Sequence, residues 1–293
     1  MNSRIQTSKS FAIVSSLLVY VFTIILVIYM GAQFNDWPVL WQIAIADIIG
    51  TIIIFFFSML FNNSSMYDPY WSVKPIVIAT FYFIVASATE VTIPQIIFLL
   101  LIGLYAVRLT ANFYLGWTDI KHEDWRYRDF RKNFPAFYWP ISFLGIHLFP
   151  TIIVYLGCLP MYVIFDYPIV YPVLTIIGSI ILLGAIVLVY IADKQLRNFR
   201  LSAENDGKTI NTGLWSRSRH PNYLGEILTW WGLFIIALGC GLEFWWTGIG
   251  AVIITLMFVF ISIPLIEKHS LKRRWDYEAY QKQVPMLLPS LKK

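Results

Sequence analysis

Long runs of apolar residues, broken by short polar connections, form the pattern along this chain. As an α-helix, a run of about 20 apolar residues is long enough to cross the roughly 30 Å hydrocarbon core of a bilayer. Eight runs fit this description: residues 10–30, 41–61, 75–89, 94–115, 141–165, 170–192, 220–240 and 245–266. The pattern predicts an all-α, polytopic transmembrane helix bundle of about eight spans. Seven spans result if the third and fourth runs form one irregular unit.

Composition supports a membrane protein, because 58% of the 293 residues are hydrophobic and only 13% are charged. A soluble domain of this length is far more polar. The first run, Phe11 to Met30, is long enough to span and is followed by no small-residue cleavage site, so it is predicted to be a helix and not a secretory signal. The two cysteines, Cys158 and Cys240, lie beside or within apolar runs and predict neither a disulfide framework nor a metal site.

The basic residues lie on one side of this map. If the N-terminus is cytoplasmic, the outward connections lie near 31–40, 90–93, 166–169 and 241–244, and none contains Lys or Arg. Lys74 and the polar loops are then on the inward side, and Arg108 is the one basic residue inside a predicted span. The distribution predicts two cytoplasmic termini in a plasma or endoplasmic-reticulum-type membrane. It also explains the net charge of +5 without nucleic acid.

Ionisable residues inside spans are costly, so each is a functional candidate. Asp47, Arg108 and Glu226 are the three that stand out. Arg108 and Asn112 are four residues apart and therefore share a helix face. The alternative for Arg108 is a structural ion pair, or a side chain that reaches toward the interface.

The cytoplasmic segments mix basic residues with aromatic ones, as in "HEDWRYRDFRKNF", "ADKQLRNFR", "GLWSRSRHPNY" and "EKHSLKRRWDYEAY". Arginines and helix N-termini bind phosphate, and aromatic rings stack on flat rings, so the mixture suits a nucleotide cofactor. An interfacial aromatic belt with basic residues is the other interpretation. Four segments of the same kind on one side favour a shared site.

The segment "SRSRHPNYLGE", residues 216–226, opens the seventh run. Pro221 suits the first helical position, so His220 lies near the cap, at the positive end of the helix dipole. Asn222 and Glu226 share a face four residues apart. An acid near a helix N-terminus is also favourable by itself, which is the structural alternative for Glu226.

"RHPNYLGE" resembles the signature of the DUF1295 proteins, which are related to steroid 5α-reductases and sterol reductases. The resemblance covers roughly residues 45–285. It includes "YDPYWSVKP" at 67–75, "RLTANF" at 108–113, "EDWRY" at 123–127, "ADKQLRNFR" at 192–200, "GLW" at 213–215 and the tail from Glu267 to Tyr280. The resemblance implies a helical membrane fold that binds NADPH from the cytoplasmic side and transfers hydride to an activated C=C bond of a lipid.

The resemblance also implies roles for individual residues. The nucleotide would be held by Asp193, Arg197, Arg200, Trp215, Arg219, His220, Asn222 and Tyr223. Arg108 and Asn112 would line the same cavity, and His269 and Tyr277 in the tail would close it. Glu226 would orient these groups or the nicotinamide amide, and counts among the catalytic candidates.

The catalytic acid is implied to lie in the N-terminal half. Steroid reductases use a Glu and a Tyr there, and Asp47 occupies the comparable helix, with Tyr67 and Asp68 as competitors in the following loop. The substrate would come from the bilayer, as a steroid, another isoprenoid, an unsaturated lipid or a fatty acyl derivative. The resemblance therefore predicts two parts of the chain: residues 1–90 would face the lipid substrate, and residues 91–293 would bind the cofactor.

Two other functions remain open. Isoprenylcysteine and phospholipid methyltransferases share the Arg-His-Pro motif and use S-adenosylmethionine, but they commonly end the last helix with two adjacent Glu, where this chain has Glu267 and Lys268. S-adenosylmethionine also has no phosphate for the many arginines. The third function is a non-enzymatic lipid-binding membrane protein. No metal is expected, because the four histidines lack ligand spacing, and the GxGxxG fingerprint is absent.

Overall fold

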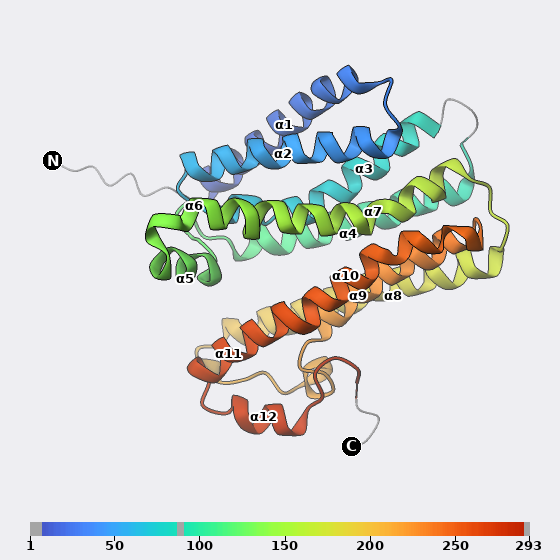
Figure 1. The fold of residues 1–293 in the computed structure, drawn as a ribbon. Coiled ribbons are helices and arrows are strands. Elements are labelled where there is room, and N and C mark those ends of the chain that lie inside the picture. Colours follow the sequence, from blue (N-terminus) through green and yellow to red (C-terminus); the bar gives the residue numbers. More distant parts are fainter. Residues whose placement is uncertain (1–7, 87–90, 290–293) are drawn as a thin grey trace. The chain divides into compact units, whose positions relative to one another are not determined.

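The computed structural model describes residues 8–86 and 91–289, and the regular structure in these ranges is helical throughout (Figure 1). In chain order the α-helices are α1 (Lys9–Gly31), α2 (Val39–Leu60), α3 (Tyr70–Ala86), α4 (Ile93–Gly116), α5 (Trp125–Asn133), α6 (Tyr138–Ile141), α7 (Phe149–Asp166), α8 (Pro172–Leu201), α9 (Pro221–Leu238), α10 (Ile249–Met257), α11 (Ile263–Arg273) and α12 (Tyr277–Gln283). Two π-helical turns, Ser142–Leu148 and Phe258–Ser262, join α6 to α7 and α10 to α11. The all-α prediction is confirmed for these ranges.

Each of the eight predicted spans overlaps a helical stretch, although residues at some of their ends, such as Phe61, Val170 and His220, lie outside the helices. Within the described ranges, six helical stretches are long and apolar enough to cross a bilayer: Lys9–Phe34, Val39–Leu60, Ile93–Gly116, Pro135–Asp166, Pro172–Leu201 and Leu242–Arg273. The chain is therefore a multi-pass membrane protein. Helices α3 and α9 are not among the six, so eight spans, both cytoplasmic termini and the type of membrane stay predictions.

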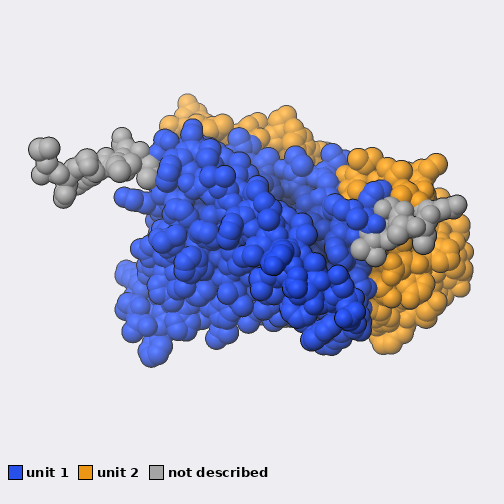
Figure 2. All heavy atoms as spheres, turned by 90° about the horizontal axis from the view of Figure 1, so that it is seen from above, with its two compact units in different colours: residues 1–88, 102–158 blue, residues 89–101, 159–293 orange. Residues whose placement is uncertain are grey.

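The chain forms two compact units, coloured separately in Figure 2. Unit 1 comprises residues 1–88 and 102–158, and unit 2 comprises residues 89–101 and 159–293. The functional division at residue 90 stays a prediction, because compactness does not test it.

In unit 1, helices α1, α2 and α3 carry the polar groups of interest. Helix α1 begins after Ser8, whose hydroxyl accepts the amide N–H of Phe11 and so satisfies one of the free donors of the first turn. Helix α3 begins at Tyr70, five residues before the predicted start. Lys74 is therefore not in a connection between helices, and its side of the membrane stays a prediction. Lys74 is in the helix and is 4% exposed.

In unit 2, α8 and α9 pack so closely that their backbones touch. A Cβ on Gly232 of α9 would lie 3.0 Å from the amide nitrogen of Leu182, and one on Gly178 of α8 would lie 2.8 Å from the carbonyl oxygen of Gly232. Gly225, Gly232 and Gly239 recur every seventh residue, which keeps them on one face of α9. Small residues at such spacing allow helices in a membrane to approach closely.

The tail of unit 2 folds back on the start of α9. The Arg219 amide donates to the carbonyl of Pro285 at 2.9 Å, and the Tyr280 hydroxyl donates to the carbonyl of Trp215. Asp276 accepts from the backbone amide and the hydroxyl of Thr209, at 2.9 and 2.6 Å. These bonds fix α12 beside the "GLW" turn.

Candidate functional site

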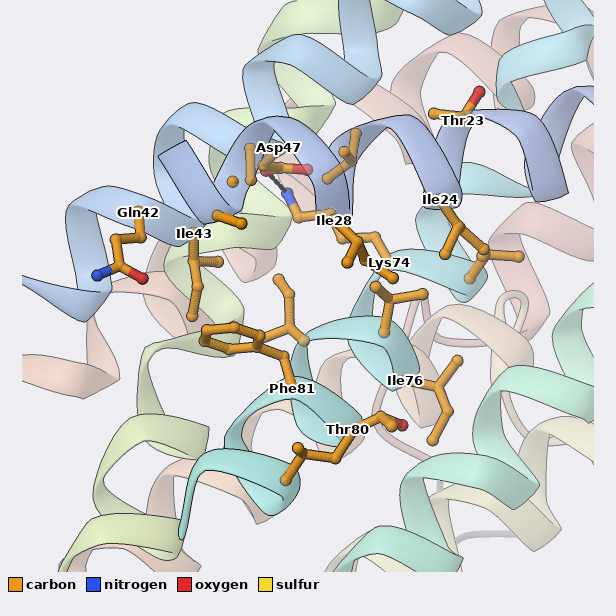
Figure 3. A pocket seen from close by; sticks show the side chains of 18 of the residues that line it. Thr23, Ile24, Ile28, Gln42, Ile43, Asp47, Lys74, Ile76, Thr80 and Phe81 are labelled. Atoms are coloured by element: carbon orange, nitrogen blue, oxygen red, sulfur yellow. Dashed lines mark ion pairs between the residues drawn. The ribbon is translucent and has the colours of Figure 1, made fainter. Parts of the chain in front are cut away.

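Helices α1, α2 and α3 of unit 1 enclose a pocket of about 500 Å³ (Figure 3). Its wall is almost wholly apolar, with Ile24, Ile28, Ile43, Ile76 and Phe81 among the lining side chains. A volume of ~300–1,000 Å³ is typical of sites for small organic ligands. The pocket therefore has the size and the character of a binding site for an apolar molecule.

A buried ion pair interrupts this apolar wall. Lys74 of α3 is paired with Asp47 of α2, and both line the pocket (Figure 3). Their side chains are 3% and 5% exposed. The Lys74 ammonium also donates to the backbone carbonyl of Thr151, at 2.5 Å. Charges taken out of water are costly unless they are paired and hydrogen-bonded, and both conditions are met here.

Tyr70 completes the polar group. Its hydroxyl donates to the second carboxylate oxygen of Asp47, at 2.9 Å. Tyr70 and Lys74 are four residues apart, so one face of α3 carries both partners of Asp47. Gly50 of α2 leaves room for this contact, since a Cβ there would lie 2.6 Å from the Tyr70 hydroxyl.

The other two N-terminal catalytic candidates lie outside the pocket, although the ring of Tyr67 packs against that of Tyr70, with centroids 5.3 Å apart. The Tyr67 hydroxyl is 2.7 Å from that of Thr151, and neither Tyr67 nor Asp68 lines the pocket. Asp68 accepts a hydrogen bond of 2.6 Å from Tyr127 of α5. Burial raises the pKa of Asp68 to about 7, and the negative charge of Asp124 contributes to the rise. Of these three candidates, only Asp47 reaches the pocket.

Unit 2 contains a second polar cluster, centred on Glu267 of α11. One of its carboxylate oxygens accepts from Arg219 Nε at 2.7 Å and contacts His220 Nε2 at 2.9 Å. The other accepts from the side-chain amide of Gln281, at 2.7 Å. Arg219 Nη1 also donates to the carbonyl of Val284, at 2.6 Å. Arg219 and His220, predicted to hold the nucleotide, thus connect α9, α11 and the tail.

Three arginines form a cationic group nearby. The charge of Arg200 at the end of α8 acts on those of Arg273 and Arg274 at the end of α11. Burial lowers the pKa of Arg274, and the charge of Arg273 adds to the effect. The negative charges of Asp193 and Asp276 act on Arg200 and Arg274 and compensate part of this positive charge. The group has the donors and the charge to bind phosphate.

The structure also places the remaining nucleotide candidates. Trp215 is 7% exposed and donates its indole N–H to the carbonyl of Ala192, so it belongs to the core. The Tyr223 ring stacks on that of His220, with centroids 5.5 Å apart, and Tyr277 is buried beside Tyr280. The others in unit 2 range from buried to exposed: Asp193, Arg197, Arg200, Asn222, Glu226 and His269.

Two candidates belong to unit 1. Arg108 and Asn112 are half-buried on α4, and the Arg108 guanidinium carbon lies 5.5 Å from the centre of the Tyr105 ring. That they line the same cavity as the residues predicted to bind the nucleotide stays a prediction. In the described residues no group of three or more His, Cys, Asp or Glu side chains is placed to hold a metal ion.

Residues 54–284 match the family described as "Protein of unknown function (DUF1295)". The chain belongs to the DUF1295 family. A similar protein is the uncharacterized protein C594.04c of Schizosaccharomyces pombe, which is 25% identical over 288 residues, or 88% of this chain and 81% of that protein. No solved structure matches. The DUF1295 match includes Tyr70, Lys74 and Glu267, and it begins after Asp47.

Sequence reasoning missed the functional candidates Lys74, Tyr70, Glu267, Gln281 and Arg274. Lys74 is within the "YDPYWSVKP" motif, but its charge was interpreted as part of the positive-inside pattern. The i, i+4 spacing of Tyr70 and Lys74 was the available signal, because it places both on one face of a helix. Gln281 had no signal of its own, since only the folded tail brings it to Glu267.

Proposed function

We propose that this DUF1295 protein is an integral-membrane oxidoreductase that reduces a C=C bond of a lipid with hydride from NADPH. The observation that carries the proposal is the apolar pocket of unit 1 with its buried group of Asp47, Lys74 and Tyr70. An enone lipid has the same character, since it is apolar throughout except for one carbonyl group. The family relationship to steroid 5α-reductases, which the motifs suggest, belongs to this proposal.

The donor set of unit 2 fits NADPH. A pyrophosphate and a 2′-phosphate require several charged donors, and guanidinium groups bind phosphate with paired, directional hydrogen bonds. Arg200, Arg273 and Arg274 supply such donors. Arg197 and Asn222, both half-buried, would add polar contacts. When bound, the cofactor would supply a hydride.

The role of Arg219 and His220 is then indirect. Both contact Glu267, and through Arg219 the tail is fixed at Val284 and Pro285. They would position the tail that closes the nucleotide site. The overall reaction would add a hydride from NADPH to the β-carbon of the enone and a proton from the aqueous medium to its α-carbon. The C=C bond becomes a single bond, and NADP⁺ remains.

The second candidate function is S-adenosylmethionine-dependent methyl transfer. One observation favours it: the Arg219–His220–Glu267 cluster keeps a buried carboxylate at the end of the last long helix, where such enzymes commonly have acids. S-adenosylmethionine carries a positive sulfonium and no phosphate. The cationic group of Arg200, Arg273 and Arg274 therefore supports NADPH over it.

The test is cofactor binding by the detergent-purified chain, with NADPH, NADH and S-adenosylmethionine titrated separately. We expect NADPH to bind at least about tenfold more tightly than NADH, because one charge-assisted contact to the 2′-phosphate contributes ~1.5–3 kcal/mol. The double variant Arg200→Ala/Arg274→Ala should lose the preference. The matched control is Arg128→Ala, an exposed arginine of α5 in unit 1.

Binding of S-adenosylmethionine in place of NADPH would move the protein to the methyltransferases. Binding of neither nucleotide would favour a non-enzymatic lipid-binding protein. Loss of NADPH binding in the Arg128→Ala control would show that the effect is not local, and the assignment of Arg200 and Arg274 would fail.

A further inference from the structure

We propose that Lys74 is the residue that recognises the ligand of the unit 1 pocket, and that this ligand is a lipid with a neutral carbonyl oxygen. The inference rests on the proposed function in one respect only, because it names the substrate contact of that reaction. The carboxylate of Asp47 and the hydroxyl of Tyr70 then act on Lys74 and not on the lipid.

The position of the charge makes Lys74 accessible to a ligand of the pocket. Lys74 and Asp47 both line the pocket, and Figure 3 shows the Lys74 nitrogen directed at Asp47 along the wall. The remaining lining is almost entirely hydrocarbon, apart from side chains such as Thr23, Thr80 and Gln42. Gln42 donates its amide to the backbone carbonyls of Asn35 and Trp37. The ion pair is therefore the strongest polar feature that a ligand meets.

The number of N–H donors leads to the same residue. A lysine ammonium has three N–H groups and no acceptor. One is paired with the Asp47 carboxylate and one donates to the Thr151 carbonyl. The nitrogen also lies 5.9 Å from the centre of the Tyr155 ring, but among the described residues the third N–H has no oxygen or nitrogen acceptor, and Lys74 borders the pocket. A ligand oxygen can complete this set, with a gain that is large because the surroundings exclude water.

The neighbours of Lys74 offer no spare donor. Asp47 is paired with Lys74, and a carboxylate can only accept hydrogen bonds. The Tyr70 hydroxyl uses its single proton on Asp47, at 2.9 Å. The Tyr20 hydroxyl donates to the carbonyl of Met66, at 3.0 Å. Lys74 is thus the group of this cluster that has a donor left.

The charge balance selects the class of ligand. The pair of Lys74 and Asp47 is neutral as a whole, so a fatty-acid carboxylate would add an uncompensated negative charge to a buried site. A carbonyl group needs only a donor, whereas a buried hydroxyl must also find an acceptor for its own proton. A ketone, aldehyde or enone with a long apolar body satisfies both conditions. In the proposed reaction, Lys74 would stabilise the negative charge that develops on this oxygen.

The experiment compares three probes of one chain length: 2-pentadecanone, 2-pentadecanol and pentadecane. Binding to the detergent-purified full chain is measured by competition, and the C=O stretch of ¹³C-labelled ketone is recorded by infrared difference spectroscopy. We expect the ketone to bind about tenfold or more above the hydrocarbon, with its C=O stretch at lower frequency than in a hydrocarbon solvent.

The decisive variant is Asp47→Asn/Lys74→Met, which removes both charges together and so avoids a single buried charge. It should bind ketone and hydrocarbon equally and lose the frequency shift. Tyr70→Phe should retain the ketone preference and the frequency shift, because Lys74 stays paired with Asp47. The control Lys9→Met removes a lysine whose ammonium contacts Leu115 outside the pocket.

Equal binding of ketone and hydrocarbon by the wild type overturns the proposal, as does a preference that survives in the double variant. A tighter alcohol than ketone would also overturn it, and loss of the shift in Tyr70→Phe would assign the contact to Tyr70. NADPH binding is measured on the same samples. If the ketone preference is present and NADPH does not bind, the inference stands and the proposed reductase fails. If NADPH binds and the ketone preference is absent, the inference fails and the proposed reductase stands.

Discussion

Helices α8 and α9 of unit 2 approach until backbone meets backbone, whereas α1, α2 and α3 of unit 1 leave a pocket of about 500 Å³. Both groups of helices are strongly apolar, so hydrophobicity does not explain the difference. Glycines every seventh residue let α9 lie against α8. In unit 1, branched and aromatic side chains line the space between the helices, and the space at Gly50 is filled by the Tyr70 hydroxyl and by the side chains of Val27 and Thr23. The positions of small residues decide which apolar helices close on one another.

The largest expected effect on stability comes from the buried ion pair of Asp47 and Lys74 in the wall of the unit 1 pocket. Asp47→Asn or Lys74→Met alone leaves a buried charge without its partner, and each should lower the free energy of unfolding by ~3–5 kcal/mol. The double variant removes both charges and should lose much less than either single variant. Thermal unfolding in detergent measures the cycle. If the double variant lost as much free energy of unfolding as the two single variants together, the two charges would not be coupled.

The second prediction tests the close packing of unit 2. Gly232→Leu places atoms where the amide nitrogen of Leu182 and the carbonyl of Gly178 lie 3.0 and 3.1 Å from the first added carbon. The helices must separate, at a cost of ~1–3 kcal/mol or more. Gly184→Leu is the matched control, because a Cβ there meets nothing within 4 Å. If the two variants had equal thermal stability, the close approach would not contribute to the fold.

The third prediction concerns the C-terminal tail of unit 2. Arg219→Met removes the donors to the partly buried carbonyls of Gln281 and Val284, and it removes one of the donors to Glu267, which keeps its contacts with His220 and with the Gln281 amide. Each unsatisfied group costs ~1–3 kcal/mol, so the tail should open more often and limited proteolysis within 277–289 should accelerate at least about tenfold. Lys282→Met, which removes only an exposed pair with Glu278, should have little effect. Equal cleavage of both variants would contradict this role of Arg219.

The smallest effect is a pH slope in unit 1. Because burial raises the pKa of Asp68 from 3.8 to about 7, the folded chain keeps a proton there that the unfolded chain releases above pH ~4. The free energy of unfolding should therefore fall as pH rises from about 4 to about 7, and level off above 7. Asp68→Asn should remove this slope, which is at most ~1.4 kcal/mol per pH unit. Melting temperatures at pH 5 and pH 8 test it, and an unchanged slope in the variant would locate the titration elsewhere.

The helices themselves could be predicted from the sequence, because an apolar run of 20 residues has few alternatives to a membrane helix. Helix ends were less predictable, and one of them mattered. The motif "YDPYWSVKP" was interpreted as a loop before a span beginning at residue 75, but α3 begins at Tyr70. That shift of five residues turns Lys74 from a surface charge into the buried partner of Asp47.

The candidate site was predictable in its parts but not in its pairings. Asp47 was identified because an acid inside a span is costly. Its partners come from another helix, and a single sequence does not show which helices meet. Glu267 and Gln281 illustrate the same limit, since their contact depends on the folding back of the tail. Trp215 matched a family motif, yet the structure places it in a core with Ala192 and Ile210.

The glycine spacing of α9 also bears on how the chain enters a bilayer. Helix α9 is not among the stretches apolar enough to cross by themselves, and its first turns carry Asn222 and Glu226. Helix α8, by contrast, meets the criterion easily and presents the face that α9 covers. We expect the translocation machinery to accept residues 172–238 as one helical hairpin, with α8 as the partner that makes insertion of α9 favourable. Insertion of α9 into the bilayer would then require Gly232, because this glycine allows the close contact with α8.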